Sequence, residues 1–290
     1  MKRKYIGIIY IITAAFFFAL MSLFVKLAGD LPTFQKSFFR NLVAVFFAFV
    51  ILVKQKPKIS INRGDLFGLV LRSTFGTIGI LCNFYAVDNL LLADATILNK
   101  LSPFFAIIMS VLILKEKIKP FQILTIAFAL FGTLFIVKPG NGVIAFPALI
   151  GLLGGISAAT AYTMVRWLGK RGVNGPFVVF FFSGFSCLAL APFTFMQFVH
   201  MTNIQLIYLV LAGFSAAIAQ FAITNAYFCA PAREISIFDY SQIIFSALLG
   251  YVVFKQVPDQ LSWIGYIIFL TSAIANFLYN KKQTNKPITQ

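Results

Sequence analysis

Residues 92–114 read LADATILNKLSPFFAIIMSVLIL, an apolar run interrupted by an acid, a lysine and a proline. A helix needs about 20 apolar residues to cross the hydrocarbon core of a bilayer, so this run is long enough to span one. Runs of similar length and composition recur along the whole chain. We place ten spans at residues 5–27, 34–53, 66–87, 92–114, 120–137, 147–168, 176–199, 205–228, 234–254 and 260–280.

These runs are continuously apolar and lack the alternation that membrane β-strands require, which favours helices. Of the 290 residues, 60% are hydrophobic and 11% are charged, against about 45–50% and about 25% in soluble domains. The composition therefore excludes a soluble or disordered protein. The first span is too long for a signal peptide, and we interpret it as a retained helix. We predict an all-α polytopic membrane protein whose function lies inside the helix bundle.

The formal net charge of +16 is explained by where the basic residues fall. Ten spans put both termini on one side of the membrane. Seventeen of the 24 lysines and arginines then lie on that side, against five on the other. Short cytoplasmic loops are enriched in Lys and Arg, so we predict an inner (cytoplasmic) membrane protein with both termini in the cytoplasm. The charge sets orientation, and we expect no nucleic-acid partner.

An internal repeat appears when the sequence is shifted by 140 residues. Leu69-Val70-Leu71 meets Leu209-Val210-Leu211, and Lys26 meets Arg166. We predict two five-helix units, residues 1–140 and 141–290. Because five is odd, the second unit begins on the opposite side of the membrane and the repeat is inverted. Inverted repeats are typical of secondary transporters, which bind substrate near the midplane and expose it alternately to each side.

One segment resembles a known family. It runs from Ala93 to Pro103 and continues through Lys115-Glu116-Lys117 to Gly132. Its small residues, mid-helix proline and loop acid are similar to the fourth and fifth helices of the ten-helix EamA-type permeases of the drug/metabolite transporter superfamily. Arg40 also fits the family pattern, whereas Gln256 and Ile243 depart from it in the second unit. The resemblance implies a small-metabolite permease, often an exporter, that does not hydrolyse ATP.

Lys100 is the leading candidate for substrate binding, because an ionisable group deep in a span is costly and is a functional hypothesis by default. Pro103 removes an amide donor and clashes with the carbonyl of Asn99, so we predict a helix break there. The alternative role for Lys100 is a structural ion pair with Asp94 or Asp239.

Other charged residues inside the spans have two interpretations each. Asp239 occupies the position of Asn99 in the other unit and is a candidate for pairing Lys100 or for carrying a coupling proton. Arg40 is suited to binding a carboxylate or phosphate, or to snorkelling outward with Lys36. Arg72 lies near the cytoplasmic end, and we expect it to snorkel. The full set of candidate substrate-binding residues is Lys100, Asn99, Arg40, Asp239, Gln242, Gln220, Asn83, Tyr85 and Tyr162.

We predict a transporter of a small metabolite, such as an amino acid or organic anion, with proton-coupled export or exchange as its mechanism. A channel or scramblase-like facilitator is the main alternative. A membrane enzyme is a weaker one, since the chain has a single histidine and none of the usual nucleophile or metal motifs. We expect no metal or cofactor, the bilayer and a small molecule as partners, and a monomer or homodimer.

Overall fold

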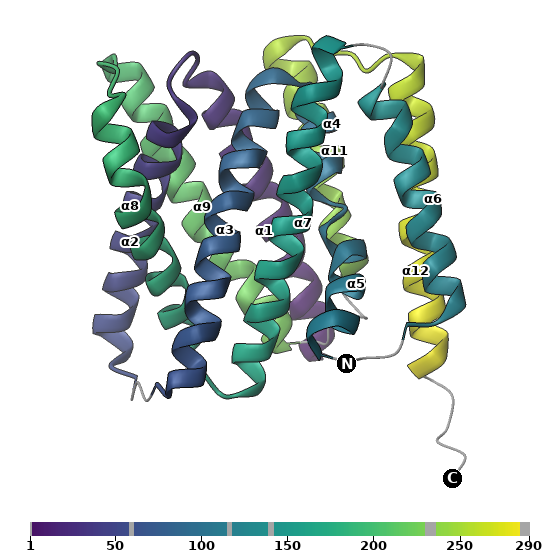
Figure 1. Cartoon of the computed structure of the whole chain (residues 1–290), viewed down its shortest axis with the longest axis horizontal. Helices are drawn as coiled ribbons and strands as arrows, with labels where there is room; N and C mark the ends of the chain where they lie inside the picture. Colours follow the sequence, from purple (N-terminus) through teal and green to yellow (C-terminus); the bar gives the residue numbers. More distant parts are fainter. Residues whose placement is uncertain (1, 58–60, 115–117, 139–141, 230–235, 285–290) are drawn as a thin grey trace.

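The computed structural model describes residues 2–57, 61–114, 118–138, 142–229 and 236–284, and within these ranges it contains helices and no strand (Figure 1). Ten segments of the described residues are long and apolar enough to span a membrane, which confirms the predicted fold class. The helical elements that make up these segments, two of which contain two elements each, have the following bounds: α1 (Lys2–Leu27), α2 (Thr33–Gln55), α3 (Arg63–Asn89), α4 (Leu92–Asn99), α5 (Ser102–Leu114), α6 (Pro120–Val137), α7 (Gly142–Lys170), α8 (Gly175–Met196), α9 (Asn203–Cys229), the 3-10 helix η1 (Ser236–Tyr240), α11 (Ser241–Phe254) and α12 (Gln260–Thr284).

Two of the ten spanning segments are discontinuous. The fourth segment is divided into α4 and α5 at Lys100 and Leu101, as Pro103 predicts. The ninth segment begins as η1 and becomes an α-helix only at Ser241, a change that the sequence did not predict. Under the shift of 140 residues the two interruptions lie at corresponding places. The interruption in the ninth segment forms without a proline. Ile243 occupies the position that corresponds to Pro103 in the first half.

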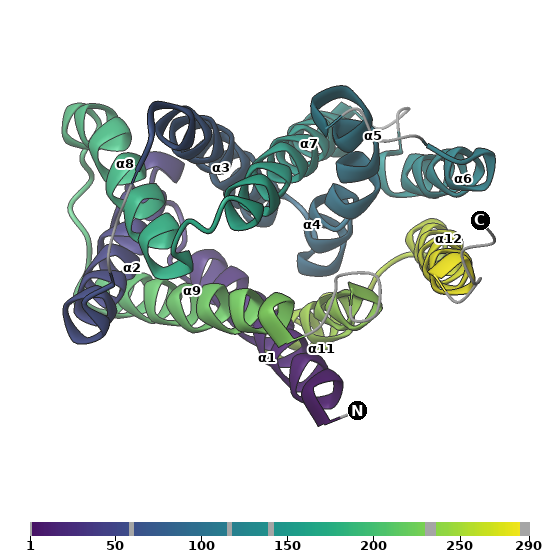
Figure 2. The same ribbon diagram turned by 90° about the horizontal axis from the view of Figure 1, so that it is seen from below.

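The helices form two layers when seen along their axes (Figure 2). One layer contains α8, α3, α7, α4, α5 and α6, and the other contains α2, α9, α1, α11 and α12. Each layer therefore combines helices from the first and the second half of the chain. The main helix pairs respect the shift of 140 residues, since α1 packs on α9 and α3 packs on α7. The exact division at residue 140 stays a prediction.

Glycines allow the closest helix crossings. Gly79 of α3 lies against Gly154 of α7, where an added Cβ at Gly79 would be 3.4 Å from the Gly154 carbonyl oxygen. Gly132 of α6 and Gly265 of α12 approach each other in the same way. Small residues at membrane helix interfaces let backbones pack directly, so Gly79 and Gly132 serve helix packing.

The outer surface is apolar. A groove of about 630 Å³ beside α2 is lined only by apolar side chains, among them Phe46, Phe180 and Val210. A surface of this kind is suited to lipid chains and offers nothing to orient a polar metabolite. Both termini lie at one end of the bundle (Figure 1), which we call the termini face, and the other end is the opposite face.

Candidate functional site

The two helix interruptions meet in an ion pair. Lys100 follows the last residue of α4, and Asp239 lies in η1, in the corresponding segment of the other half. The Lys100 Nζ donates to Asp239 Oδ2 at 2.6 Å, and the two residues are only 5% and 8% exposed. The predicted pairing across the two halves is therefore present. Asp239 Oδ1 is buried and has no hydrogen-bond partner.

Asp94 is not the partner of Lys100, so that alternative is wrong. Its Oδ1 accepts a hydrogen bond of 2.6 Å from the Tyr266 hydroxyl of α12. Asp94 lies in the first turn of α4, about one and a half helical turns before Lys100, and its side chain faces a different neighbour.

Hydrogen bonds join α4 to α11 and to the segment that follows α11. Thr96 Oγ1 donates to Ser246 Oγ at 2.8 Å, and the Leu92 amide donates to the Gln256 side chain at 3.0 Å. Ser246 follows Asp239 at a spacing that puts both on one helix face, yet the contact of Ser246 with Thr96 was not predicted. Helical spacing identifies the polar face of one helix, whereas the residue opposite it depends on how two helices are packed.

The interruption of the fourth segment lies against a glycine of α7. An added Cβ at Gly155 would be 2.6 Å from the carbonyl oxygen of Leu98, near the end of α4. The backbone of α7 can therefore approach the interruption only because residue 155 has no side chain. This approach fixes Lys100 at mid-bundle, since α4 and α7 pack together.

Two arginines lie inside the bundle. Arg40 of α2 is 1% exposed and Arg72 of α3 is 4% exposed, so the prediction that Arg72 snorkels is wrong. The Arg72 guanidinium lies 3.8 Å from the centre of the Phe182 ring of α8, an aromatic contact that stabilises it in the interior. Arg40, Arg72 and Tyr162 of α7 are within electrostatic range of one another, and Tyr162 is also within range of Asp239.

The other predicted residues are placed unevenly. Gln242 is buried one turn after Asp239, and Tyr162 is 37% exposed although it lies on a central helix. Tyr85 is not brought to this centre, because its ring packs edge-on against Phe146, which is 59% exposed. The half-buried members of the set, whose relation to the ion pair stays a prediction, are Asn99, Asn83 and Gln220.

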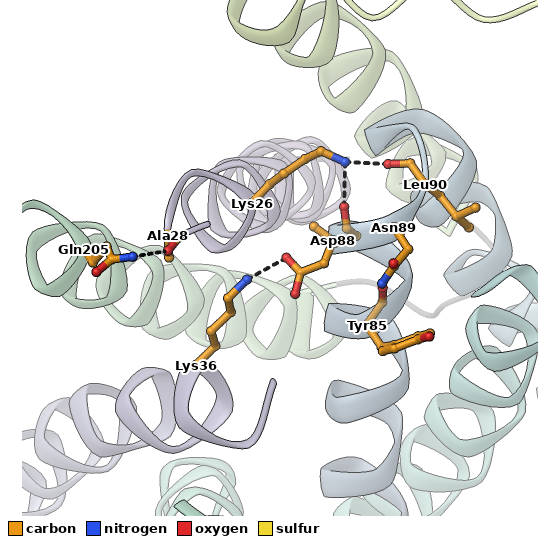
Figure 3. A network of polar contacts seen from close by, with 9 residues as sticks. Lys26, Ala28, Lys36, Tyr85, Asp88, Asn89, Leu90 and Gln205 are labelled. Carbon is orange, nitrogen blue, oxygen red and sulfur yellow. Dashed lines mark hydrogen bonds and ion pairs between the residues drawn. The ribbon is translucent and has the colours of Figure 1, made fainter. Parts of the chain in front are cut away.

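A polar network that the sequence did not predict joins the two layers at the opposite face (Figure 3). Lys36 of α2 is fully buried and donates to Asp88 of α3 at 2.7 Å. Lys26 of α1 donates to the Val87 carbonyl at 2.7 Å and also to that of Leu90. Two lysines of one layer thus hold the C-terminal end of α3 in the other layer, where carbonyl groups and the helix dipole favour a cation. The sequence signal for this network was Asp88, an acidic residue near the C-terminal end of α3 that needs a basic partner.

More contacts on the same face join neighbouring segments. Gln35 exchanges two hydrogen bonds with the backbone of Val199, and Gln205 donates to the Ala28 carbonyl. At the edge of the bundle, Lys138 donates to Asp259 at 2.6 Å. This hydrogen bond, with one from the Ser262 amide, lowers the pKa of Asp259.

Comparison with known proteins gives a family match for the first half of the chain. Residues 5–138 match the sequence profile of the EamA-like transporter family. The pseudopaline exporter CntI of Pseudomonas aeruginosa is 29% identical over 93% of this chain and 95% of its own. Residues 5–138 are thus similar to the EamA-like transporter family, which confirms the resemblance. The chain is a multi-pass membrane protein that is similar over most of its length to a protein named as an exporter.

Two further relatives are also named as transporters. An uncharacterized transporter of Helicobacter pylori is 27% identical over 92% of this chain and 93% of its own. A riboflavin transporter of Brucella anthropi is 24% identical over 84% and 87%. A solved crystal structure matches 96% of this chain and 98% of its own with a TM-score of 0.68, and its 15% identity supports the fold alone. The relatives with a named activity are transporters.

Proposed function

We propose that this protein is a secondary transporter that moves a small metabolite across the cytoplasmic membrane by alternating access. The observation that carries the proposal is the buried Lys100–Asp239 ion pair, which joins the two layers at the two helix interruptions. Interrupted helices at corresponding places of two halves are the usual location of a transporter binding site. One chain contains both layers, so a monomer suffices, with a homodimer as the alternative.

The contacts on the opposite face support a closed state of that face. Lys26 and Lys36 attach one layer to the end of α3 in the other. With both termini in the cytoplasm, this arrangement closes the bundle toward the outside. Rocking of the layers would break these contacts and expose the centre to that side.

The substrate we propose is a small metabolite such as an amino acid or organic anion, and the direction is export. The relative named as a pseudopaline exporter supports the direction. Protonation of Asp239 would remove its charge and release Lys100, so proton exchange is the coupling that fits this ion pair.

Counterflow in proteoliposomes tests the proposal. Vesicles loaded with a mixture of unlabelled amino acids and organic acids are diluted into the same labelled compounds, one at a time. A carrier gives saturable, transient accumulation of at least one compound, and Lys100→Ala abolishes it. Flux that rises linearly with concentration would instead identify a channel, and empty vesicles together with the exposed-site variant Arg63→Gln serve as controls.

A further inference from the structure

Arg40 and Arg72 are two buried cations with no acidic partner among the described residues. The ion pairs of that part of the chain, such as Lys100–Asp239 and Lys36–Asp88, involve other side chains. Arg40 and Arg72 are nonetheless almost completely buried and lie within electrostatic range of each other. Asp239 and Asp88 compensate Lys100 and Lys36, whereas the ion pairs of the described residues leave Arg40 and Arg72 without such compensation. A buried like-charge pair is unfavourable unless something neutralises it.

The contacts that these arginines do make leave donors unused. Arg40 Nη1 donates to Asn41 Oδ1 at 2.6 Å, and Arg72 lies over the ring of Phe182. The Nε of each arginine is buried and has no hydrogen-bond partner. A guanidinium carries five N–H donors in a planar fork, and that fork matches a carboxylate or phosphate. Unsatisfied donors on both arginines are therefore available for an anion.

Buried hydroxyl groups without hydrogen-bond partners lie on α2, α3 and α8, the helices that carry Arg40, Arg72 and Phe182. They belong to Ser37, one turn before Arg40, to Ser73 and Ser183, which follow Arg72 and Phe182 in the sequence, and to Thr194 farther along α8. Each of these side chains is 1% exposed or less. The helices that carry them, α2, α3 and α8, pack against one another. Buried polar groups are normally hydrogen-bonded, so several unpartnered groups in one region require an explanation.

We propose that Arg40 and Arg72 bind a doubly charged anionic end of the transported molecule, either two carboxylates or one phosphate group. The proposal rests on the transport function proposed above and names the chemical class of its substrate. It also moves the anion site away from Lys100, because Asp239 already neutralises that lysine. The hydroxyls of Ser73 and Ser183 donate further hydrogen bonds to the same anion.

Thermal unfolding of the purified full-length protein tests the site without a transport assay. The probes are glutarate, inorganic phosphate, and butyrate as a single-charge control, all at matched ionic strength in chloride. Glutarate or phosphate should raise the melting temperature by about 5 °C at a hundredfold excess over Kd. Butyrate should raise it less. Stabilisation by glutarate alone assigns a dicarboxylate, and stabilisation by phosphate alone assigns a phosphate group.

Variants separate binding from structure. Arg40→Gln and Arg72→Gln should lose the response to glutarate and phosphate, whereas Arg63→Gln, an exposed arginine on the same helix as Arg72, should keep it. Without added anion, both glutamine variants should melt no lower than the unmodified protein, since each removes an unneutralised charge. Variants that melt lower and still respond to the anions would overturn the proposal, as would a lack of response in the unmodified protein.

A second readout covers glutamine variants that fail to fold. In a Ser183→Cys protein, glutarate or phosphate should slow maleimide labelling severalfold, and unchanged labelling would count against the site. This protein also carries serine at Cys82, Cys187 and Cys229. Anion stabilisation without counterflow would support an anion site at the two arginines and reject the proposed transport function. Saturable counterflow without anion stabilisation would do the reverse.

Discussion

Lys100 and Asp239 lie 139 residues apart in the sequence and 2.6 Å apart in the structure, each at the interruption of a membrane-spanning segment. Two charges that are both more than nine-tenths buried depend on each other, because either one alone would be an uncompensated charge. The pair therefore couples the two layers energetically as well as spatially.

Replacing one member of this pair should cost more than replacing both. Lys100→Ala should destabilise the protein by about 3–5 kcal/mol, since Asp239 is left buried and unpaired. The double variant Lys100→Ala with Asp239→Ala should recover most of that loss. Both single variants, Lys100→Ala and Asp239→Ala, and the double variant should be inactive in counterflow. Chemical unfolding in detergent gives the double-mutant cycle. Additive losses would show that the two charges do not interact.

Lys36 should act as part of the closure of the opposite face. Lys36→Met keeps the length of the side chain but breaks the ion pair with Asp88, so the face should open more often. The reporter is a cysteine at Ser37, which is fully buried, in a protein without its native cysteines. Labelling by an impermeant maleimide from the outside should rise severalfold.

Lys138→Met is the matched control for that experiment. It removes the more exposed Lys138–Asp259 ion pair at the edge of the same face. Labelling at position 37 should stay at its original level in this variant. Equal increases in Lys36→Met and Lys138→Met would mean that general loosening, and not the Lys36–Asp88 contact, controls access.

Gly155 should tolerate no side chain. Gly155→Ala places a Cβ 2.6 Å from the Leu98 carbonyl oxygen, which is backbone and cannot rotate away. We expect a loss of about 1–3 kcal/mol in stability and reduced transport. Gly169→Ala on the same helix meets nothing within 4 Å and should be neutral in both measurements. Thermal melts and counterflow of the two variants, run side by side, decide the matter.

The Lys138–Asp259 pair should give a small pH dependence. The hydrogen bond from Lys138 lowers the pKa of Asp259 below its ordinary value of 3.8. Its stabilisation is therefore present above pH 3.8 and is lost as the pH falls through the lowered pKa. Asp259→Asn should melt slightly below the unmodified protein at pH 7, and the difference should vanish in acid. A difference that persists at low pH would assign it to packing.

The sequence predicted the spans and the interruption at Pro103 because both follow from local properties, apolar length and a missing amide donor. The start of the ninth segment was not predictable in this way, since Ile243 gives no such signal. The prediction that Arg72 snorkels relied on its distance from the helix end alone. The sequence does not show that the aromatic ring of Phe182, on another helix, holds Arg72 in the interior.

The contacts of the candidate site were only partly predictable for the same reason. The Lys100–Asp239 pair could be anticipated because the repeat places the two residues in corresponding segments. The contacts of Lys26 and Lys36 with the end of α3 depend on how α1 and α2 are oriented against it. The energetic cost of burying a charge predicts that a buried lysine needs a partner, but only the packed structure identifies that partner.

The mixing of both halves in each layer has a consequence for biosynthesis. α1 leaves the ribosome first, yet its main packing partner, α9, is made roughly two hundred residues later. Until then the newly inserted helices expose to lipid the small residues that later form tight crossings. We expect the nascent chain to be held by the insertion machinery or a membrane chaperone during this interval, so that the bundle assembles late and as a whole.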